Sequence, residues 1–315
     1  MNLKSSVGIL SGIFFAMSSS GEFSTSFDNL NNAGSFLPEN DLHLEDNNMS
    51  TLGQDMTEEE FTQALTEVSE EYEEAFEKNG LSYRLQLRWS NNTVNATASQ
   101  RWGRAYVTMY GGLARRPEIT LDAVVLVLCH ELGHHFGGYP LYPDSRWASN
   151  EGMSDYFSTH VCVPNAWKND LAKNAEAEKT VHPVAKSKCD AAWESIEERH
   201  VCYRIANAGE SVANLFAALK PERGAANYST PSTDVVSETY HSHPQSQCRL
   251  DTYLAGALCS VTPQDLSYIP GKDEENSRRM REAALKSAEF NCTEYNGDVV
   301  GFRPRCWYKP ILSAE

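Results

Sequence analysis

The stretch LDAVVLVLCHELGHHF, residues 121–136, constrains this fold most. Its first turns are almost wholly apolar, which is typical of a helix buried on every side. Into this helix the sequence places His130, Glu131 and His134. Because a buried polar side chain is costly without a partner, the fold must supply one to each of them.

The spacing of the two histidines indicates what that partner is. His130 and His134 are four residues apart, so on a helix they lie on one face, one turn above each other. Two imidazoles placed in this way can share a zinc ion, with Glu131 beside them directed at a metal-bound water. The pattern H-E-x-x-H also arises by chance in roughly one chain of this length in a hundred, so the buried context has to favour the metal.

A zinc site needs a third protein ligand. The pattern H-E-x-x-H-x-x-G-x-x-H is excluded because its last position is Pro140. In the stretch SNEGMSDYF, Asn150 can cap a helix that Glu151 opens, and Asp155 follows four residues later on the same face. We expect Glu151 to be the third ligand and Asp155 to fix the orientation of a ligand histidine. The alternative is a surface helix with two solvated acids.

Three stretches together resemble the gluzincin peptidases, in particular the zinc endopeptidases that include CAAX-processing proteases and bacterial stress-response membrane proteases. They are VTMYGGLARRPEITLDAVVLVLCHELGHHFGG, EGMSD and SHPQSQCRLDTYLAG, the last with His243, Pro244 and Arg249 at the expected spacing. The resemblance implies that Glu131 is the general base and that His243 and Arg249 line the cleft as catalytic residues. It also implies that strand RAYVTMYGG pairs with an extended peptide. The alternatives for His243 and Arg249 are a loop histidine and a surface ion pair.

The resemblance is incomplete. Members of that family usually carry transmembrane helices, and this sequence shows none beyond its N-terminal apolar run, so it predicts an exported member without stable membrane insertion. Residues 163–230 match nothing in the family.

Composition and cysteines place the chain outside the cytoplasm. Residues 1–20 predict a signal peptide, residues 21–56 an acidic low-complexity linker or an inhibitory prosegment, and residues 57–315 the zinc metallopeptidase domain. Eight cysteines behind such a leader favour disulfides and a secreted or periplasmic protein. Cys248 and Cys259 lie about 16 Å apart along one predicted helix, too far to pair.

A net charge of −16 without a basic stripe argues against nucleic acid as a partner.

Periodicity predicts an α+β fold. Thr57 and Glu60 form a capping box that begins a helix ending at Gly80. Alternation from Leu81 to Trp89, then NATASQ and RAYVTMYGG, predict strands, and the rest is mainly helical, at roughly 150–162, 188–217, 246–259 and 276–290. We expect a zincin-like domain, mainly helical, with a small antiparallel sheet whose edge strand precedes the H-E-x-x-H helix.

The sequence therefore predicts a zinc-dependent endopeptidase with one Zn²⁺ per chain that hydrolyses protein or peptide substrates. A non-catalytic zinc-containing peptide-binding protein on the same fold is the alternative, and a disulfide-rich module with an accidental H-E-x-x-H would bind no zinc. The expected metal ligands are His130, His134 and Glu151, with Asp155 behind them, and the expected catalytic residues are Glu131, His243 and Arg249.

Overall fold

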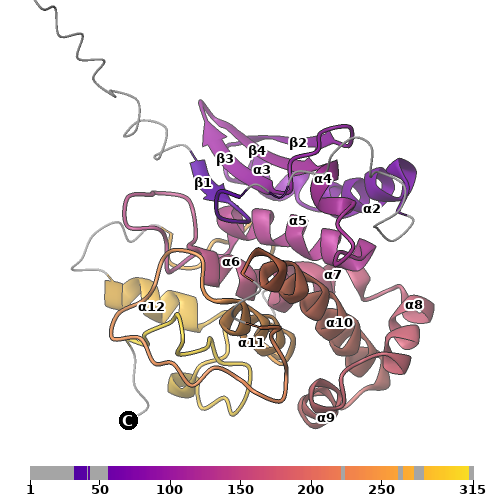
Figure 1. Cartoon of the computed structure of the whole chain (residues 1–315). Helices are drawn as coiled ribbons and strands as arrows, with labels where there is room; N and C mark the ends of the chain where they lie inside the picture. The colour runs from indigo at the N-terminus through magenta and orange to yellow at the C-terminus, as the bar shows by residue number, and fades with distance from the viewer. Residues whose placement is uncertain are drawn as a thin grey trace, which may run out of the picture.

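A computed structural model describes residues 32–40, 42, 56–220, 224–261, 265–272 and 280–311. The predicted signal peptide and most of residues 21–56 lie outside the described residues. Figure 1 shows a small sheet at one end of the molecule, with α2, α3 and α4 at the level of the sheet, helix α5 beneath it, and the later helices on the far side of α5. The fold is α+β, as predicted.

The sheet has four strands in the order β1-β3-β4-β2. Strand β3 runs antiparallel to β1 and to β4, whereas β2 runs parallel to β4, so the sheet is mixed and the prediction of an antiparallel sheet was wrong. The alternation of apolar residues indicates which face of a strand is buried, but not which strand lies next to it. The strands are β1 (Asn32–Ser35), β2 (Ser82–Arg88), β3 (Ala96–Arg101) and β4 (Arg104–Tyr110).

The strand that precedes the H-E-x-x-H helix is not at the edge of the sheet. Strand β4 is paired on both sides, with β2 and with β3, so it has no free side for a peptide. The side of β3 away from β4 carries β1, which comes from the stretch assigned by composition to a linker or prosegment. Packed structure thus begins ahead of Thr57.

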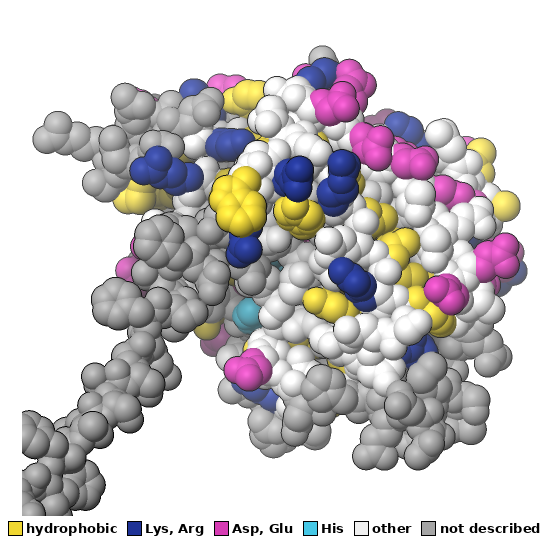
Figure 2. All heavy atoms as spheres, turned by 90° about the horizontal axis from the view of Figure 1, so that it is seen from above, with side chains coloured by type: hydrophobic (Ala, Val, Ile, Leu, Met, Phe, Trp, Pro, Cys, Tyr) yellow, Lys and Arg dark blue, Asp and Glu magenta, His cyan; other side chains and the backbone are white. Residues whose placement is uncertain are grey.

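Figure 2 shows Lys and Arg side chains spread over the face of the molecule seen from above, although the chain is acidic overall. Four arginines of the strands are exposed: Arg84, Arg88, Arg101 and Arg104. The opposite face of the sheet packs on α5.

The first two helices are short because the predicted helix breaks near Tyr72. Helix α2 (Glu58–Glu70) begins with the predicted capping box, in which the Thr57 hydroxyl and the Glu60 carboxylate satisfy each other's backbone N–H. Helix α3 (Glu73–Lys78) follows after the break. Their apolar faces remain in the core, as the periodicity predicted: Phe61, Leu65, Val68, Tyr72 and Phe76 are all buried.

Helix α5 (Leu121–Phe136) is the centre of the molecule. Thr120 caps its first turn, and every residue from Ala123 to Phe136 is buried. Gly133 allows the next helix, α6 (Glu151–Phe157), to come close, because a Cβ at Gly133 would lie 2.9 Å from the backbone of Ser154. The close approach brings the first residue of α6 beside the histidines of α5.

The helical remainder surrounds α5 and α6. The predicted helix at 188–217 is two helices, because Ser195 and Glu198 form a second capping box that starts a new one. Helix α6 continues into a π-helix, η2. The other elements are α4 (Gly111–Ala114), η2 (Ser158–Cys162), α7 (Val163–Trp167), α8 (Leu171–Glu176), η3 (Ala177–Lys179), α9 (Pro183–Ala192), α10 (Ile196–Leu219), α11 (Ser246–Ala257), α12 (Met280–Ala288) and η5 (Glu294–Asn296).

All eight cysteines form disulfides, which fits an oxidising compartment. Cys248 and Cys259 are not paired with each other, as predicted from their helical separation. The pairs are Cys129–Cys162, Cys189–Cys202, Cys248–Cys306 and Cys259–Cys292. Among the described residues, no helix combines the length and the apolar character that crossing a membrane requires.

Candidate metal centre

Three side chains meet at the contact between α5 and α6. His130 and His134 project from one face of α5, and Glu151 opens α6, where the Asn150 side chain caps the helix by accepting from the backbone N–H of Met153. One ligand atom from each of the three residues lies within 4.8 Å of the others. The Glu151 carboxylate is 3.3 Å from His130 Nε2 and 3.8 Å from His134 Nε2. All three side chains are fully buried.

Hydrogen bonds on the far side of each imidazole orient the rings. His134 Nδ1 donates to the backbone carbonyl of Ser149 at 2.8 Å, and since a carbonyl only accepts, Nε2 is left with its lone pair. His130 Nδ1 lies 2.8 Å from the carboxylate of Asp155, the contact expected from the spacing of Glu151 and Asp155. Both Nε2 atoms are therefore available as metal ligands.

The buried atoms that converge here lack partners. Within the described part of the chain, His130 Nε2, His134 Nε2 and Glu151 Oε2 have no hydrogen-bond partner, although all are buried. Such groups are normally satisfied, because burying them alone is costly. Two imidazoles and one carboxylate are a donor set typical of catalytic zinc. The residues therefore fit a divalent cation.

A fourth buried group belongs to the same cluster. Glu131 is fully buried, and neither of its carboxylate oxygens has a hydrogen-bond partner among the described residues. Burial is the main cause that raises the pKa of Glu131 to about 8, and the nearby carboxylate of Glu151 adds to it. A bound cation would act in the opposite direction and favour the carboxylate form.

The remaining pKa shifts follow from burial and from the two neighbouring carboxylates. Burial alone would lower the pKa of His130, but Asp155 and Glu151 outweigh it and raise the pKa to about 9. Burial lowers the pKa of His134 to about 4. Burial would raise the pKa of Glu151, yet the electrostatic interaction with His243 and the contact with His130 hold it well below its usual range.

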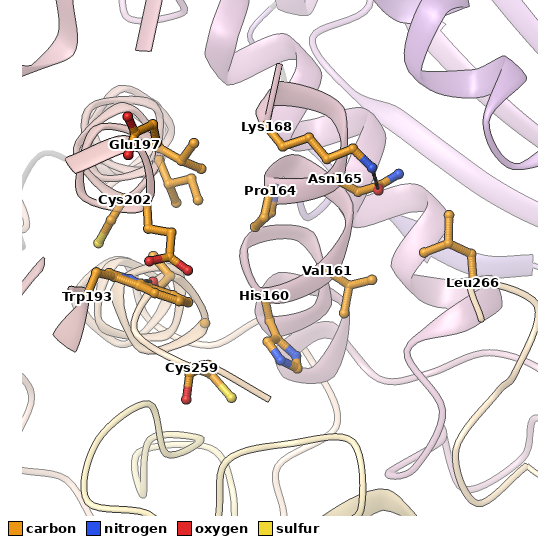
Figure 3. Close-up of a pocket in the computed structure, with 16 residues that line it drawn as sticks. His160, Val161, Pro164, Asn165, Lys168, Trp193, Glu197, Cys202, Cys259 and Leu266 are labelled. Carbon is orange, nitrogen blue, oxygen red and sulfur yellow. Dashed lines mark hydrogen bonds between the residues drawn. The ribbon is translucent and has the colours of Figure 1, made fainter. Parts of the chain in front are cut away.

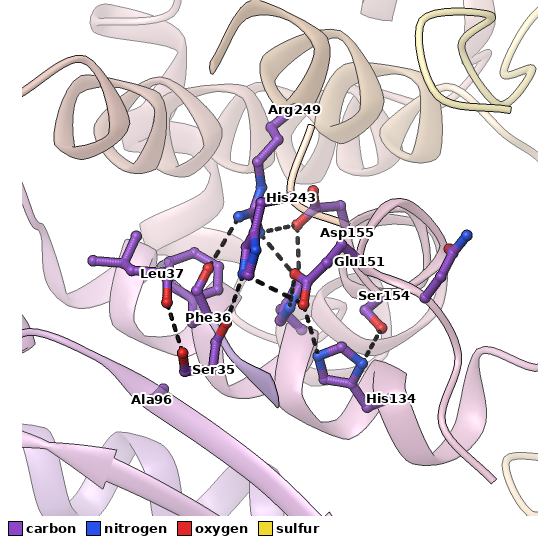
Figure 4. A network of polar contacts seen from close by, with 12 residues as sticks. Ser35, Phe36, Leu37, Ala96, His134, Glu151, Ser154, Asp155, His243 and Arg249 are labelled. Carbon is purple, nitrogen blue, oxygen red and sulfur yellow. Dashed lines mark hydrogen bonds and ion pairs between the residues drawn. The ribbon is translucent and has the colours of Figure 1, made fainter. Parts of the chain in front are cut away.

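Arg249, on α11, lies behind the ligands rather than in an open cleft. It is fully buried, and its Nη2 donates to Asp155 Oδ1 at 2.6 Å (Figure 4). Its guanidinium also stacks on the rings of Phe36 and Phe216, at 4.6 Å and 4.1 Å from their centroids. Arg249 therefore acts on the metal ligands through Asp155, which it holds ionised next to His130.

His243 lies in the loop before α11. Its Nε2 is 3.5 Å from Glu151 Oε1 and 2.7 Å from the backbone carbonyl of Ser35, to which it donates (Figure 4). It is the least buried of the predicted site residues, with 23% of its side chain exposed. The structure thus places it beside the metal ligands and in contact with a backbone carbonyl.

Tyr142 was not identified from the sequence. Its hydroxyl donates to Glu151 Oε1 at 2.6 Å, and burial together with the negative charge of Glu151 raises its pKa well above the ordinary value. Tyr142 belongs to the loop between α5 and α6 and to none of the quoted motifs. Nothing in the sequence distinguishes it from the other 13 of the chain's 14 tyrosines.

The neighbours of His130 and His134 on α5 have other contacts. His135 stacks on Trp147, with 4.6 Å between ring centroids, and burial lowers its pKa to about 3. Cys129 is half of a disulfide. Neither belongs to the metal-ligand group.

A cavity of about 400 Å³ lies between η2, which continues α6, and α10 (Figure 3). His160 of η2, Trp193 and Glu197 contribute to its lining, together with the Cys259 end of α11. None of the three candidate ligands, His130, His134 and Glu151, lines this cavity.

Comparisons with protein-family models, with curated proteins and with solved structures gave no match. The resemblance to gluzincin peptidases consequently rests on the motifs quoted from the sequence.

Proposed function

We propose that this chain is a zinc-dependent endopeptidase of the gluzincin type. The observation that carries the proposal is Glu131. Three ligands suffice to hold a metal. A fourth residue beside them, an acid buried without a hydrogen-bond partner in the described structure, is a cost that binding alone does not require. A general base that serves a metal-activated water needs such a carboxylate at this position.

The position of the site within the fold supports the same function. Two histidines on a buried helix beneath a sheet, with a glutamate from the start of the next helix, form the arrangement that the gluzincin resemblance implies. Zinc prefers imidazole and carboxylate donors in this number. We assign the metal as Zn²⁺, one per chain, on a zincin-like domain.

In the proposed reaction, bound zinc would lower the pKa of water and polarise the scissile carbonyl. Glu131 accepts a proton from the attacking water and returns it to the leaving amine. His243 donates a hydrogen bond to a backbone carbonyl of the substrate, as it does to Ser35 in this structure. Asp155 and Arg249 keep His130 in the orientation that presents Nε2.

The compartment follows from the cysteines. Four disulfides form and persist where thiols are oxidised, so we place the enzyme in the periplasm or outside the cell. Its substrates are accordingly proteins or peptides found there.

The test pairs zinc content with proteolysis. Wild type and Glu131→Gln are purified and assayed for zinc by elemental analysis and for cleavage of casein, with Glu77→Gln, an exposed glutamate on α3, as the matched control. We expect one zinc in all three proteins and cleavage by wild type and Glu77→Gln alone. Absence of zinc, or wild-type cleavage by Glu131→Gln, contradicts the proposal. Zinc without cleavage by any of them, even after the covering segment described below is severed, favours the non-catalytic peptide-binding protein.

A further inference from the structure

The N-terminal stretch 32–37 lies on the metal centre as an added strand. Strand β1 pairs antiparallel with β3, with Asn32 opposite Ser99 and Ser35 opposite Thr97. The pairing continues past the end of the strand, where Phe36 donates its backbone N–H to the carbonyl of Ala96 at 2.9 Å. Peptides that bind by strand addition use the same main-chain hydrogen bonds.

One side chain from the body of the protein clamps the end of this stretch. Asn95 accepts from the backbone N–H of Leu37 at 2.9 Å and donates to the Leu37 carbonyl at 3.2 Å. Both contacts are to the main chain of Leu37, the residue that follows Phe36.

His243, which we assign to substrate binding, and Arg249, which lies behind the candidate ligands, both hold this stretch. His243 donates to the carbonyl of Ser35 at 2.7 Å, and Arg249 Nη1 donates to the carbonyl of Phe36 at 3.1 Å (Figure 4). The Phe36 ring meets the ligand His130 edge to face, at 4.9 Å between centroids. The stretch thus occupies the place where a peptide would have to lie to reach the metal.

We attribute the burial of the candidate site to this segment. A peptidase must admit a protein chain to its metal, yet His130, Glu131 and Glu151 are completely buried here. Phe36, whose ring packs on His130, and Leu37 are completely buried as well. We expect a substrate to reach the candidate ligands once this segment is displaced.

Next to the candidate ligands, the backbone of this segment is not in the extended conformation expected of a peptide substrate. Between Asn32 and Ser35 the strand contains one more residue than β3 does, which is a β-bulge. Gly34 has φ +102°, a region that residues with a side chain rarely adopt. A Cβ built on Gly34 would lie 3.9 Å from Glu151 Oε1. The main chain nearest the ligands is therefore bent rather than extended.

We propose that residues 34–37 are a built-in competitive occupant of the substrate cleft, and that peptides reach the metal by replacing this segment as the strand paired with β3. The inference rests on the proposed function in so far as the cleft is that of a peptidase. It also moves the peptide-binding strand from β4, expected from the sequence, to β3, and it assigns the position of Phe36 to an aromatic or large apolar side chain of the substrate.

The test cuts the chain between this segment and the body of the protein. A recognition sequence for a site-specific protease replaces residues 43–50 of the full chain, and the purified zinc-loaded protein is cut and passed over a size-exclusion column. We expect casein cleavage to rise at least tenfold once the N-terminal fragment has separated, and a synthetic peptide of residues 31–42 to reverse the rise. If the fragment co-elutes, the Phe36→Ala version should release it and raise the rate.

Point variants of the uncut chain give a second measurement. Asn95→Ala removes both contacts with Leu37 and should raise the rate severalfold. Asn91→Ala, which removes a side-chain hydrogen bond to Thr93 in the same loop, should not change it.

Binding separates this inference from the proposed function. Fluorescence anisotropy of the labelled 31–42 peptide is measured on the cut protein, with the Phe36→Ala peptide as control. Binding that the control peptide lacks supports the segment's role even if no form hydrolyses casein, in which case only the proposed function fails. A separated body that binds no peptide and cleaves casein no faster than the uncut chain overturns the inference and leaves the peptidase proposal intact.

Discussion

Replacing Asp155 by Asn should weaken both zinc binding and folding. Asp155 Oδ1 accepts from His130 Nδ1 at 2.8 Å, from Arg249 Nη2 at 2.6 Å and from the Tyr253 hydroxyl at 2.9 Å. Asparagine keeps the shape of the side chain but removes its charge. The Arg249 guanidinium, which is fully buried, then has no carboxylate directly against it.

The two effects have different sizes. Removing one partner of a buried ion pair costs about 3–5 kcal/mol of unfolding free energy, because the remaining charge stays buried. Losing the group that orients a ligand histidine weakens metal binding by about 10- to 100-fold. That loss corresponds to about 1.4–2.7 kcal/mol of binding free energy. Asp155→Asn should therefore be strongly destabilised, yet still bind zinc with a measurable Kd.

Competition with a chromophoric chelator gives the zinc Kd, and guanidinium chloride titration gives the unfolding free energy. Asp251→Asn is the matched control, since Asp251 lies on α11 and accepts from Ser232 and Gln247 but does not contact the metal ligands. We expect the control to keep the wild-type zinc Kd. Wild-type zinc affinity in folded Asp155→Asn would refute the argument that Asp155 orients His130. Wild-type stability would refute the argument that it compensates Arg249.

Three further predictions concern the body of the fold. Gly152→Ala should lower the unfolding free energy by about 1–3 kcal/mol in denaturant titrations, because a Cβ there would lie 2.2 Å from the ring of Trp307. Burial lowers the pKa of His160 from 6.5 to about 4, so the unfolded chain takes up a proton first as the pH falls. The contribution of neutral His160 to the unfolding free energy is then complete above about pH 6.5 and is lost towards pH 4. About 2 kcal/mol of it is lost by pH 5. Thermal melts at pH 7 and pH 5 should therefore show a smaller loss of stability for His160→Gln than for wild type. Arg204→Lys should cost about 2 kcal/mol, measured in the same way, because one of the two hydrogen bonds to the Asp122 carboxylate, each 2.8 Å, is lost; equal stability would contradict a bidentate pair.

The metal-ligand group could be predicted from the sequence because it depends on local geometry. An α-helix places residues i and i+4 on one face whatever surrounds it, which relates His130 to His134 and Glu151 to Asp155. Only the meeting of the two helices required tertiary structure, and the small residue Gly133 is its local cause.

The strand order and the covering segment could not be predicted in this way. His243 and Ser35 are 208 residues apart in sequence, and no periodicity relates them. The stretch around Phe36 and Leu37 is short and lies among polar residues, so its composition indicates a linker, although two large apolar side chains suffice to dock it. Arg249 was identified as a site residue, but its complete burial depends on Phe36 and Phe216, which come from distant parts of the chain.

The Cys129–Cys162 disulfide has a consequence for how a metal is acquired. The two cysteines are 33 residues apart in sequence. The loop that they close contains all three candidate ligands, from His130 to Glu151. In an oxidised chain that has not yet folded, this tether keeps the ligands at a raised effective concentration for one another. In a reduced chain they diffuse apart more freely and capture a cation less readily. For the proposed zinc site, we therefore expect an oxidised chain to take up the metal at a lower zinc concentration than a reduced chain.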